Sequence, residues 1–150
     1  MAAELPRLIE AQVAVDDRGQ LTFANDFDFK GVKRFYTVEN FSTSVIRAWH
    51  GHLKESKYIL PVSGSAIVAA VKLDNPSNPS KSNPIQRFIL SSKKPALLYV
   101  PAGHANGFRY LEKGTKLMFF STASLEESKG DDIRFAHDYW GVDVWTVKNR

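Results

Sequence analysis

Short runs rich in β-branched and aromatic residues dominate the chain, and Gly, Pro, Asn and Ser separate them. Long helical periodicity is scarce. Many short runs with turn signals between them predict an all-β sandwich or barrel. The expected strands cover residues 21–23, 32–38, 45–52, 58–62, 65–72, 86–90, 96–100, 107–111 and 116–122.

The segments outside these runs are shorter and simpler. Residues 74–84, DNPSNPSKSNP, predict a loop because Asn-Pro turns recur there with no apolar anchor. Residues 1–10 predict a short helix or an arm, residues 125–130 a single helical turn, and residues 133–145 an aromatic closing segment. With no internal repeat and no domain boundary, residues 1–150 are expected to form a single domain.

The composition of the chain indicates a globular protein that needs no disulfides and has no membrane-spanning segment. A chain of 150 residues that is 43% hydrophobic can bury a core without disulfides, and it contains no cysteine. The N-terminus shows no basic segment followed by an apolar run, and no apolar stretch reaches membrane-spanning length. We therefore expect a cytoplasmic protein with no membrane partner.

Charge argues against a nucleic-acid partner. The net charge is +4, but the basic residues are scattered and their longest run is the pair Lys93-Lys94. Nucleic-acid binders usually gather such residues on a stripe or a tail. A mild positive excess fits a small phosphorylated ligand better.

The stretch IRAWHGH holds the most informative chemistry. Alternate residues of a strand share a face, so His50 and His52 should point the same way. Two imidazoles on one face indicate either a metal site or an acid–base site. The simpler alternative is a pair of partly exposed histidines with no role.

The surrounding spacing resembles the cupin signature and predicts a cupin-type jelly-roll β-barrel. That signature has His-x-His, a glutamate, a glycine and a later histidine, but Lys57 and Asn106 occupy two of the four ligand positions here. A lysine ammonium repels a divalent cation, and a neutral amide is a poor substitute for imidazole. We therefore expect neither a metal nor another cofactor, although His104 and Glu55 offer an alternative ligand set.

A cupin without its metal ligands, with a lysine seven residues after a histidine, resembles the dTDP-4-dehydrorhamnose 3,5-epimerase family. Arg47 to His52 also resembles the Arg-Gly-x-His-x-His motif of the sugar-nucleotide 3,4-ketoisomerases. Further similar segments are DRGQL (17–21), NDF (25–27), VKRFY (32–36), VPAG (100–103), NGF (106–108), IRF (133–135) and GVDVW (141–145).

This resemblance implies the roles of several residues. His50 would remove a proton next to a sugar ketone, and Lys57 would face the developing enolate. The aspartate that orients the base falls at Asp138 or at the neighbouring His137. An imidazole suits proton abstraction and return at neutral pH.

Phe119 departs from the family pattern. Counting thirteen residues on from Asn106 leads to Phe119, where the epimerases carry a tyrosine that protonates the second face of the ring. A double epimerisation by that route is therefore doubtful. Two alternatives stay open: a one-face reaction using His50 and His52, as in a 3,4-ketoisomerase, or an epimerase with another acid such as Tyr110 or Tyr139.

The remaining candidates concern substrate binding. Arg18, Arg34 and Arg47 are candidate diphosphate contacts, because guanidinium binds phosphate through paired hydrogen bonds. Trp49, Phe108 and Phe119 are candidate pocket aromatics. The expected substrate site includes Asn106, Tyr110 and Tyr139 as well.

Three functional hypotheses follow. The first is an epimerase or ketoisomerase acting on a nucleotide-linked 4-keto-6-deoxy sugar, with dTDP as the expected nucleotide. The second is a cupin that binds the sugar nucleotide without turning it over, and the third is a metal-dependent enzyme using His50, His52 and His104. By resemblance, and because pairing covers sheet edges, a homodimer is expected.

Overall fold

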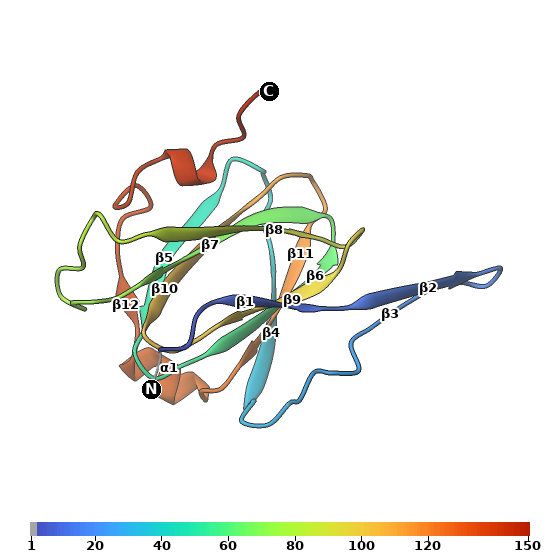
Figure 1. Ribbon diagram of the computed structural model, residues 1–150, viewed down its shortest axis with the longest axis horizontal. Coiled ribbons are helices and arrows are strands. Elements are labelled where there is room, and N and C mark those ends of the chain that lie inside the picture. Colours follow the sequence, from blue (N-terminus) through green and yellow to red (C-terminus); the bar gives the residue numbers. More distant parts are fainter. Residues whose placement is uncertain (1–2) are drawn as a thin grey trace.

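Two five-stranded antiparallel sheets form the body of the protein in the computed structural model, which describes residues 3–150 (Figure 1). The first sheet has the order β1 (Arg7–Glu10), β9 (Ala96–Val100), β6 (Lys57–Ser63), β11 (Lys116–Ser121) and β4 (Arg34–Glu39). The second has the order β12 (Ile133–Arg134), β5 (Ile46–His52), β10 (His104–Tyr110), β7 (Ser65–Lys72) and β8 (Ile85–Ser91).

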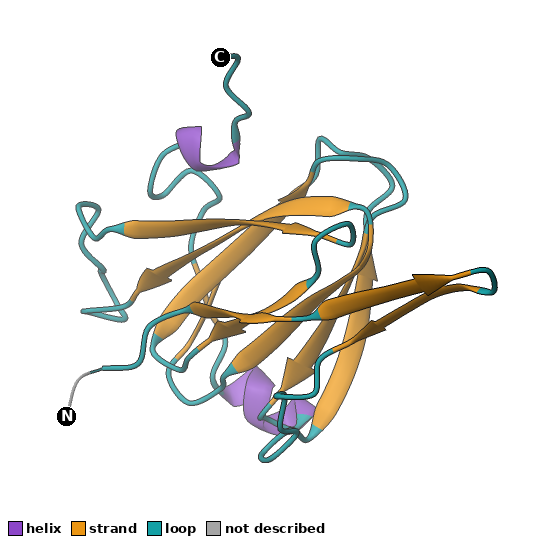
Figure 2. Cartoon of the chain, turned by 45° about the vertical axis from the view of Figure 1, so that its right-hand side comes forward, coloured by secondary structure: helices purple, strands orange, loops and turns teal. Residues whose placement is uncertain are grey.

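Four further elements lie outside the two sheets. A hairpin of β2 (Gln12–Asp16) and β3 (Gly19–Phe23) extends away from the body (Figure 1). The helix α1 (Leu125–Gly130) lies at one end of the sheets, and the 3-10 helix η1 (Asp143–Trp145) lies near the C-terminus (Figure 2). None of the helices within residues 3–150 is long and apolar enough to cross a membrane.

The all-β prediction is confirmed, and every expected strand is present with small shifts at its ends. Of the two alternatives for residues 1–10, the helix is wrong, because residues 7–10 pair with β9 as a strand. Met1 and Ala2 lie outside the described residues. The expected jelly roll is also present: within residues 3–150 the two sheets share no strand, so it is an open two-sheet jelly roll.

Apolar side chains from both sheets meet in the space between them. Ile59 on β6, Val68 on β7, Phe108 on β10 and Phe119 on β11 belong to this inner core. Burial of apolar surface supplies most of the stabilisation of a domain of this size. The inner core also fixes the positions of the strands that line the cavity described below.

A second core covers the outer face of the second sheet. Trp49 on β5 packs there against Trp140 and Trp145, with ring centroids 5.1 and 5.0 Å away. This explains why six consecutive residues of β7, Ala66 to Val71, are buried: one face of the strand meets each core. Trp49 is fully buried in this outer core, so it lies away from the expected sugar pocket.

Gly107 permits a close approach between β10 and β5. A Cβ at this position would lie 2.4 Å from the Cβ of Ala48 and 2.9 Å from the ring of Trp145. The pairing of β10 with β5 shifts register at this point, between Asn106 and Phe108. Only glycine allows β5, β10 and the C-terminal segment to pack together here.

Candidate functional site

A cavity of about 350 Å³ opens between the two sheets, on the side that α1 covers. Its walls come from β4, β6 and β11 of the first sheet, β5 and β10 of the second, and the segment from α1 to β12. The lining residues are Tyr36, Val38, Arg47, His50, His52, Lys57, Asn106, Phe108, Phe119, Leu125, Ser128, Lys129, Asp132 and Arg134.

His50 occupies the middle of the β5 wall. Its cross-strand partners are Asn106 on β10 and Arg134 on β12, and all three line the cavity. Burial, with the positive charges of Arg134 and Lys57, lowers the pKa of His50 to about 4. At neutral pH the imidazole is therefore uncharged and able to accept a proton.

His52 lies between an acid and a base. Its Nδ1 is 3.1 Å from Glu55 Oε2, a close contact without the alignment of a full hydrogen bond, and its Nε2 is 3.3 Å from Lys57 Nζ. Since the amino group of Lys57 donates to Nε2, the ring proton belongs on Nδ1, facing the carboxylate. Burial and Lys57 lower the pKa of His52, while Glu55 opposes that shift.

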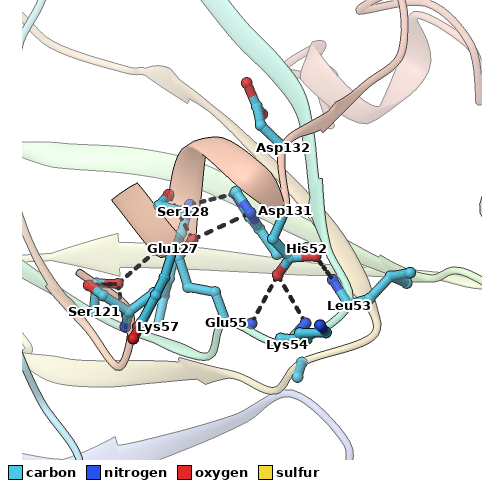
Figure 3. Close-up of polar contacts among 12 residues, drawn as sticks. His52, Leu53, Lys54, Glu55, Lys57, Ser121, Glu127, Ser128, Asp131 and Asp132 are labelled. Atoms are coloured by element: carbon cyan, nitrogen blue, oxygen red, sulfur yellow. Dashed lines mark hydrogen bonds and ion pairs between the residues drawn. The ribbon is translucent and has the colours of Figure 1, made fainter. Parts of the chain in front are cut away.

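Glu55 is fully buried beneath the cavity and holds several groups together (Figure 3). Its Oε1 accepts a 2.6 Å hydrogen bond from Ser121 Oγ, and its Oε2 accepts a 2.8 Å hydrogen bond from Ser128 Oγ. Arg34 Nη2 lies 3.7 Å from Oε1. Burying a carboxylate costs free energy unless it is hydrogen-bonded, and here its partners also join β5, β11 and α1.

The side chain of Asp131 fixes the turn that carries Glu55 (Figure 3). Its carboxylate accepts hydrogen bonds of 2.8, 2.8 and 3.1 Å from the backbone N–H groups of Leu53, Lys54 and Glu55. Burial acts to raise the pKa of Asp131, but these three donors outweigh it and lower the pKa. The position of Glu55 thus depends on a residue that follows α1.

The buried amino group of Lys57 is available to the cavity. Lys57 begins β6 and is 8% exposed, and burial lowers its pKa, opposed by the charge of Glu55. A surface lysine would be solvated and mobile, whereas this one is confined beside His52. Such a donor can stabilise negative charge that develops on a bound ligand.

Seven residues expected from the sequence meet in this cavity. They are Arg47, His50, His52, Lys57, Asn106, Phe108 and Phe119. Tyr36 and Arg134 also line it, but neither was singled out from the sequence. The signal for Tyr36 was available, since it alternates with Arg34 and Val38 along one face of β4.

Other expected residues lie elsewhere. Arg18 is on the β2–β3 turn, where it pairs with Asp16, and Asp138 is exposed outside the cavity, so the expected pairing of Asp138 with His50 is absent. Tyr110 donates to the carbonyl of Val38, and Tyr139 donates to that of Pro79 at 2.7 Å. These hydroxyls are committed to the protein itself.

Arg34 also lies behind the cavity wall. Its Nε donates to the carbonyl of Ala123 at 3.1 Å, and its guanidinium lies 4.8 Å from the centroid of the Tyr36 ring. Both interactions, with the nearby carboxylate of Glu55, give Arg34 a place in the buried network rather than at the cavity surface.

The residues that the structure describes contain no group of three His, Asp or Glu side chains arranged to hold a metal ion. His104, the alternative ligand, directs its Nδ1 to the carbonyls of Pro101 and Ala102, at 3.2 and 3.3 Å. The donor set therefore fits a metal ion poorly.

Solved structures similar to this one share its two-sheet architecture. They include the QdtA 3,4-ketoisomerase of Thermoanaerobacterium thermosaccharolyticum in complex with TDP, with 19% identity, a TM-score of 0.67 and 93% of each chain covered. The rmlC epimerase of Mycobacterium tuberculosis has 21% identity and a TM-score of 0.73, over 95% of this chain and 73% of that one. These similarities confirm the cupin-type fold.

A third similar structure is the dTDP-4-dehydrorhamnose 3,5-epimerase of Bacillus anthracis, with 24% identity, a TM-score of 0.65 and coverage of 81% of this chain and 75% of that one. No match was found among curated protein sequences. The model of the family described as dTDP-4-dehydrorhamnose 3,5-epimerase matches residues 5–149, almost the whole chain. On that match, the chain belongs to the dTDP-4-dehydrorhamnose 3,5-epimerase family.

Proposed function

We propose that this protein isomerises a dTDP-linked 4-keto-6-deoxy sugar, with His50 removing a proton from the carbon next to the ketone. The observation that carries the proposal is the uncharged imidazole of His50 in the same cavity as the amino group of Lys57. A neutral base and a hydrogen-bond donor are what enolisation requires.

The chemistry follows from the weak acidity of a carbon next to a carbonyl. As His50 takes the proton, the C–H electron pair moves into the new carbon–carbon double bond and negative charge gathers on the ketone oxygen. Lys57 is the donor positioned to stabilise that oxygen, and such a donor is typically worth about 10²–10³ in rate. Return of a proton to carbon completes an epimerisation or a ketone shift.

Basic residues at the cavity support a diphosphate as part of the ligand. Arg47, Lys129 and Arg134 line it, and Arg47 is oriented by a 2.7 Å hydrogen bond from its Nε to Asn40 Oδ1. The aromatic rings of Phe108 and Phe119 provide an apolar surface for a sugar or a base. The similar QdtA structure is a complex with TDP, which supports the choice of nucleotide.

A homodimer in the cytoplasm completes the proposal. Every residue of β2 is exposed and the hairpin extends from the body, while Phe29 and Phe35 are 57% and 66% exposed on the adjoining surface. Apolar surface of this kind favours burial against another chain. Size-exclusion chromatography with light scattering tests the dimer, and a monomer at micromolar concentration contradicts it.

Proton NMR in D₂O tests the catalytic proposal. Incubation of the protein with dTDP-4-keto-6-deoxyglucose should remove the signal at C3, at C5, or at both, because solvent deuterium replaces the abstracted proton. His50→Asn should abolish this loss while retaining affinity for dTDP, measured by calorimetry. Absence of exchange with the unmodified protein, or unchanged exchange with His50→Asn, contradicts the proposal.

A further inference from the structure

Tyr36 places a phenol hydroxyl in the cavity wall beside Phe119, whose ring has no hydroxyl. The two residues are direct cross-strand partners on β4 and β11, and their rings stack with centroids 5.0 Å apart and planes 4° from parallel. Both line the cavity. Paired residues of neighbouring strands point to the same face of a sheet, so the hydroxyl of Tyr36 belongs to the wall that Phe119 helps to form.

The hydroxyl of Tyr36 makes no hydrogen bond to any residue in the described range 3–150, in contrast to those of Tyr110 and Tyr139. Its half-buried ring lies between Phe119 and the guanidinium of Arg34. Buried tyrosine hydroxyls usually have a partner. An uncommitted hydroxyl on a ring that lines a cavity is therefore available to a ligand.

The surroundings keep this phenol protonated until it is used. Burial is the main cause that raises the pKa of Tyr36, and the negative charge of Glu55 adds to it. Arg34 acts in the other direction and would stabilise the phenolate once the proton has left. Tyr36 is thus arranged to donate a proton at neutral pH and not to accept one.

His50 and Tyr36 belong to different sheets and line the same cavity from opposite walls. His50 is on β5 of the second sheet, and Tyr36 is on β4 of the first. An enolate is planar at the carbon that has lost its proton. If a base on one wall removes the proton and an acid on the other wall supplies a new one, the configuration of that carbon inverts.

We infer that Tyr36 is the proton donor opposite His50, so that the enzyme inverts the carbon it deprotonates, an inference that rests on the function proposed above. The C–H electron pair passes into the enolate as His50 takes the proton. The enolate then takes the proton of the Tyr36 hydroxyl on its other face, forming a new C–H bond and leaving a phenolate. His50 afterwards loses its proton to water and Tyr36 regains one, so no other reactant is consumed.

Comparison of exchange with turnover tests this assignment. The unmodified protein, Tyr36→Phe and the control Tyr58→Phe are each incubated in D₂O with dTDP-4-keto-6-deoxyglucose. Tyr58 stacks on Tyr99 outside the cavity, so its variant should behave as the unmodified protein. Tyr36→Phe should retain exchange at C3 or C5, since His50 is intact, but form the inverted product about 100-fold more slowly.

The outcomes separate this inference from the proposed function. Absence of exchange in the unmodified protein refutes the proposed function and the inference together. With exchange present, equal turnover by Tyr36→Phe overturns the role of Tyr36 and leaves the enolisation intact. Equal loss of exchange and turnover, or a product whose ketone has moved without inversion, also overturns it.

Discussion

The Nδ1 atom of His52 lies 3.1 Å from Oε2 of Glu55, and the side chain of Glu55 is fully buried. Only three positions separate the two residues, yet the contact forms because Asp131 folds the intervening turn back under β5. With Lys57 donating to Nε2, the ring proton of His52 lies on Nδ1, where the nearby carboxylate of Glu55 stabilises it. Its Nε2 is left facing Lys57 and the cavity.

Glu55→Gln should impair both catalysis and stability. Without the carboxylate, His52 loses its orienting charge and Arg34 loses a buried counter-charge. We expect turnover to fall about tenfold or more, and the free energy of unfolding to fall by about 3 kcal/mol, as when one partner of a buried pair is removed. Urea denaturation and initial rates measure the two effects. Glu126→Gln, at an exposed position of α1, is the matched control. If the two variants have equal turnover and equal free energies of unfolding, the role of Glu55 is contradicted.

The pH dependence of exchange should reflect the unusual environment of His50. A general base acts only when uncharged, so the rate falls as the pH drops through its pKa. Because that pKa is lowered to about 4 from an ordinary 6.5, exchange at about pH 5.5 should retain most of its rate at neutral pH. Exchange rates between about pH 4 and 8, with circular dichroism to verify folding, provide the test. A rate that is halved near pH 6.5 would contradict the lowered pKa.

Lys57→Met should slow the reaction by about 10²–10³ while leaving dTDP binding intact, because it removes the donor that stabilises the enolate oxygen. The matched control is Lys54→Met, three positions away and exposed. Initial rates and calorimetric titration with dTDP separate catalysis from binding. A loss confined to dTDP affinity would assign Lys57 to binding instead.

Asp131→Asn should destabilise the turn beneath His52. Three backbone N–H groups lose a charged acceptor, and we expect the free energy of unfolding to fall by about 3 kcal/mol at neutral pH. Since the pKa of Asp131 is lowered below 3.8 in the folded state, its contribution is complete above that value and disappears as the pH falls through the folded pKa. Urea titrations should therefore show that the difference in free energy of unfolding between the unmodified protein and Asp131→Asn becomes smaller from about pH 4 downward. Asp17→Asn, at an exposed position, is the control. A stability difference between the unmodified protein and Asp131→Asn that does not depend on pH contradicts this role of Asp131.

Local pattern determined the strands. Short runs rich in β-branched and aromatic residues, such as that of β7, predicted the positions of the strands, and period two placed His50 and His52 on one face of β5. The hairpin strand β2 escaped prediction because neither of its faces is buried, so its sequence carries no core-facing signal. The strand β12 is too short to carry a pattern.

The remainder of the site is set by contacts between distant segments. The register of β4 against β11 places Tyr36 opposite Phe119, and the fold of the segment after α1 brings Asp131 under Glu55 and Arg134 beside His50. A periodic pattern specifies which face a residue occupies, but not which residue of another strand lies opposite. The sequence by itself determined the two-sheet fold and the histidine strand. Only the tertiary structure decided what surrounds that strand, because cross-strand register and sheet packing depend on the whole chain.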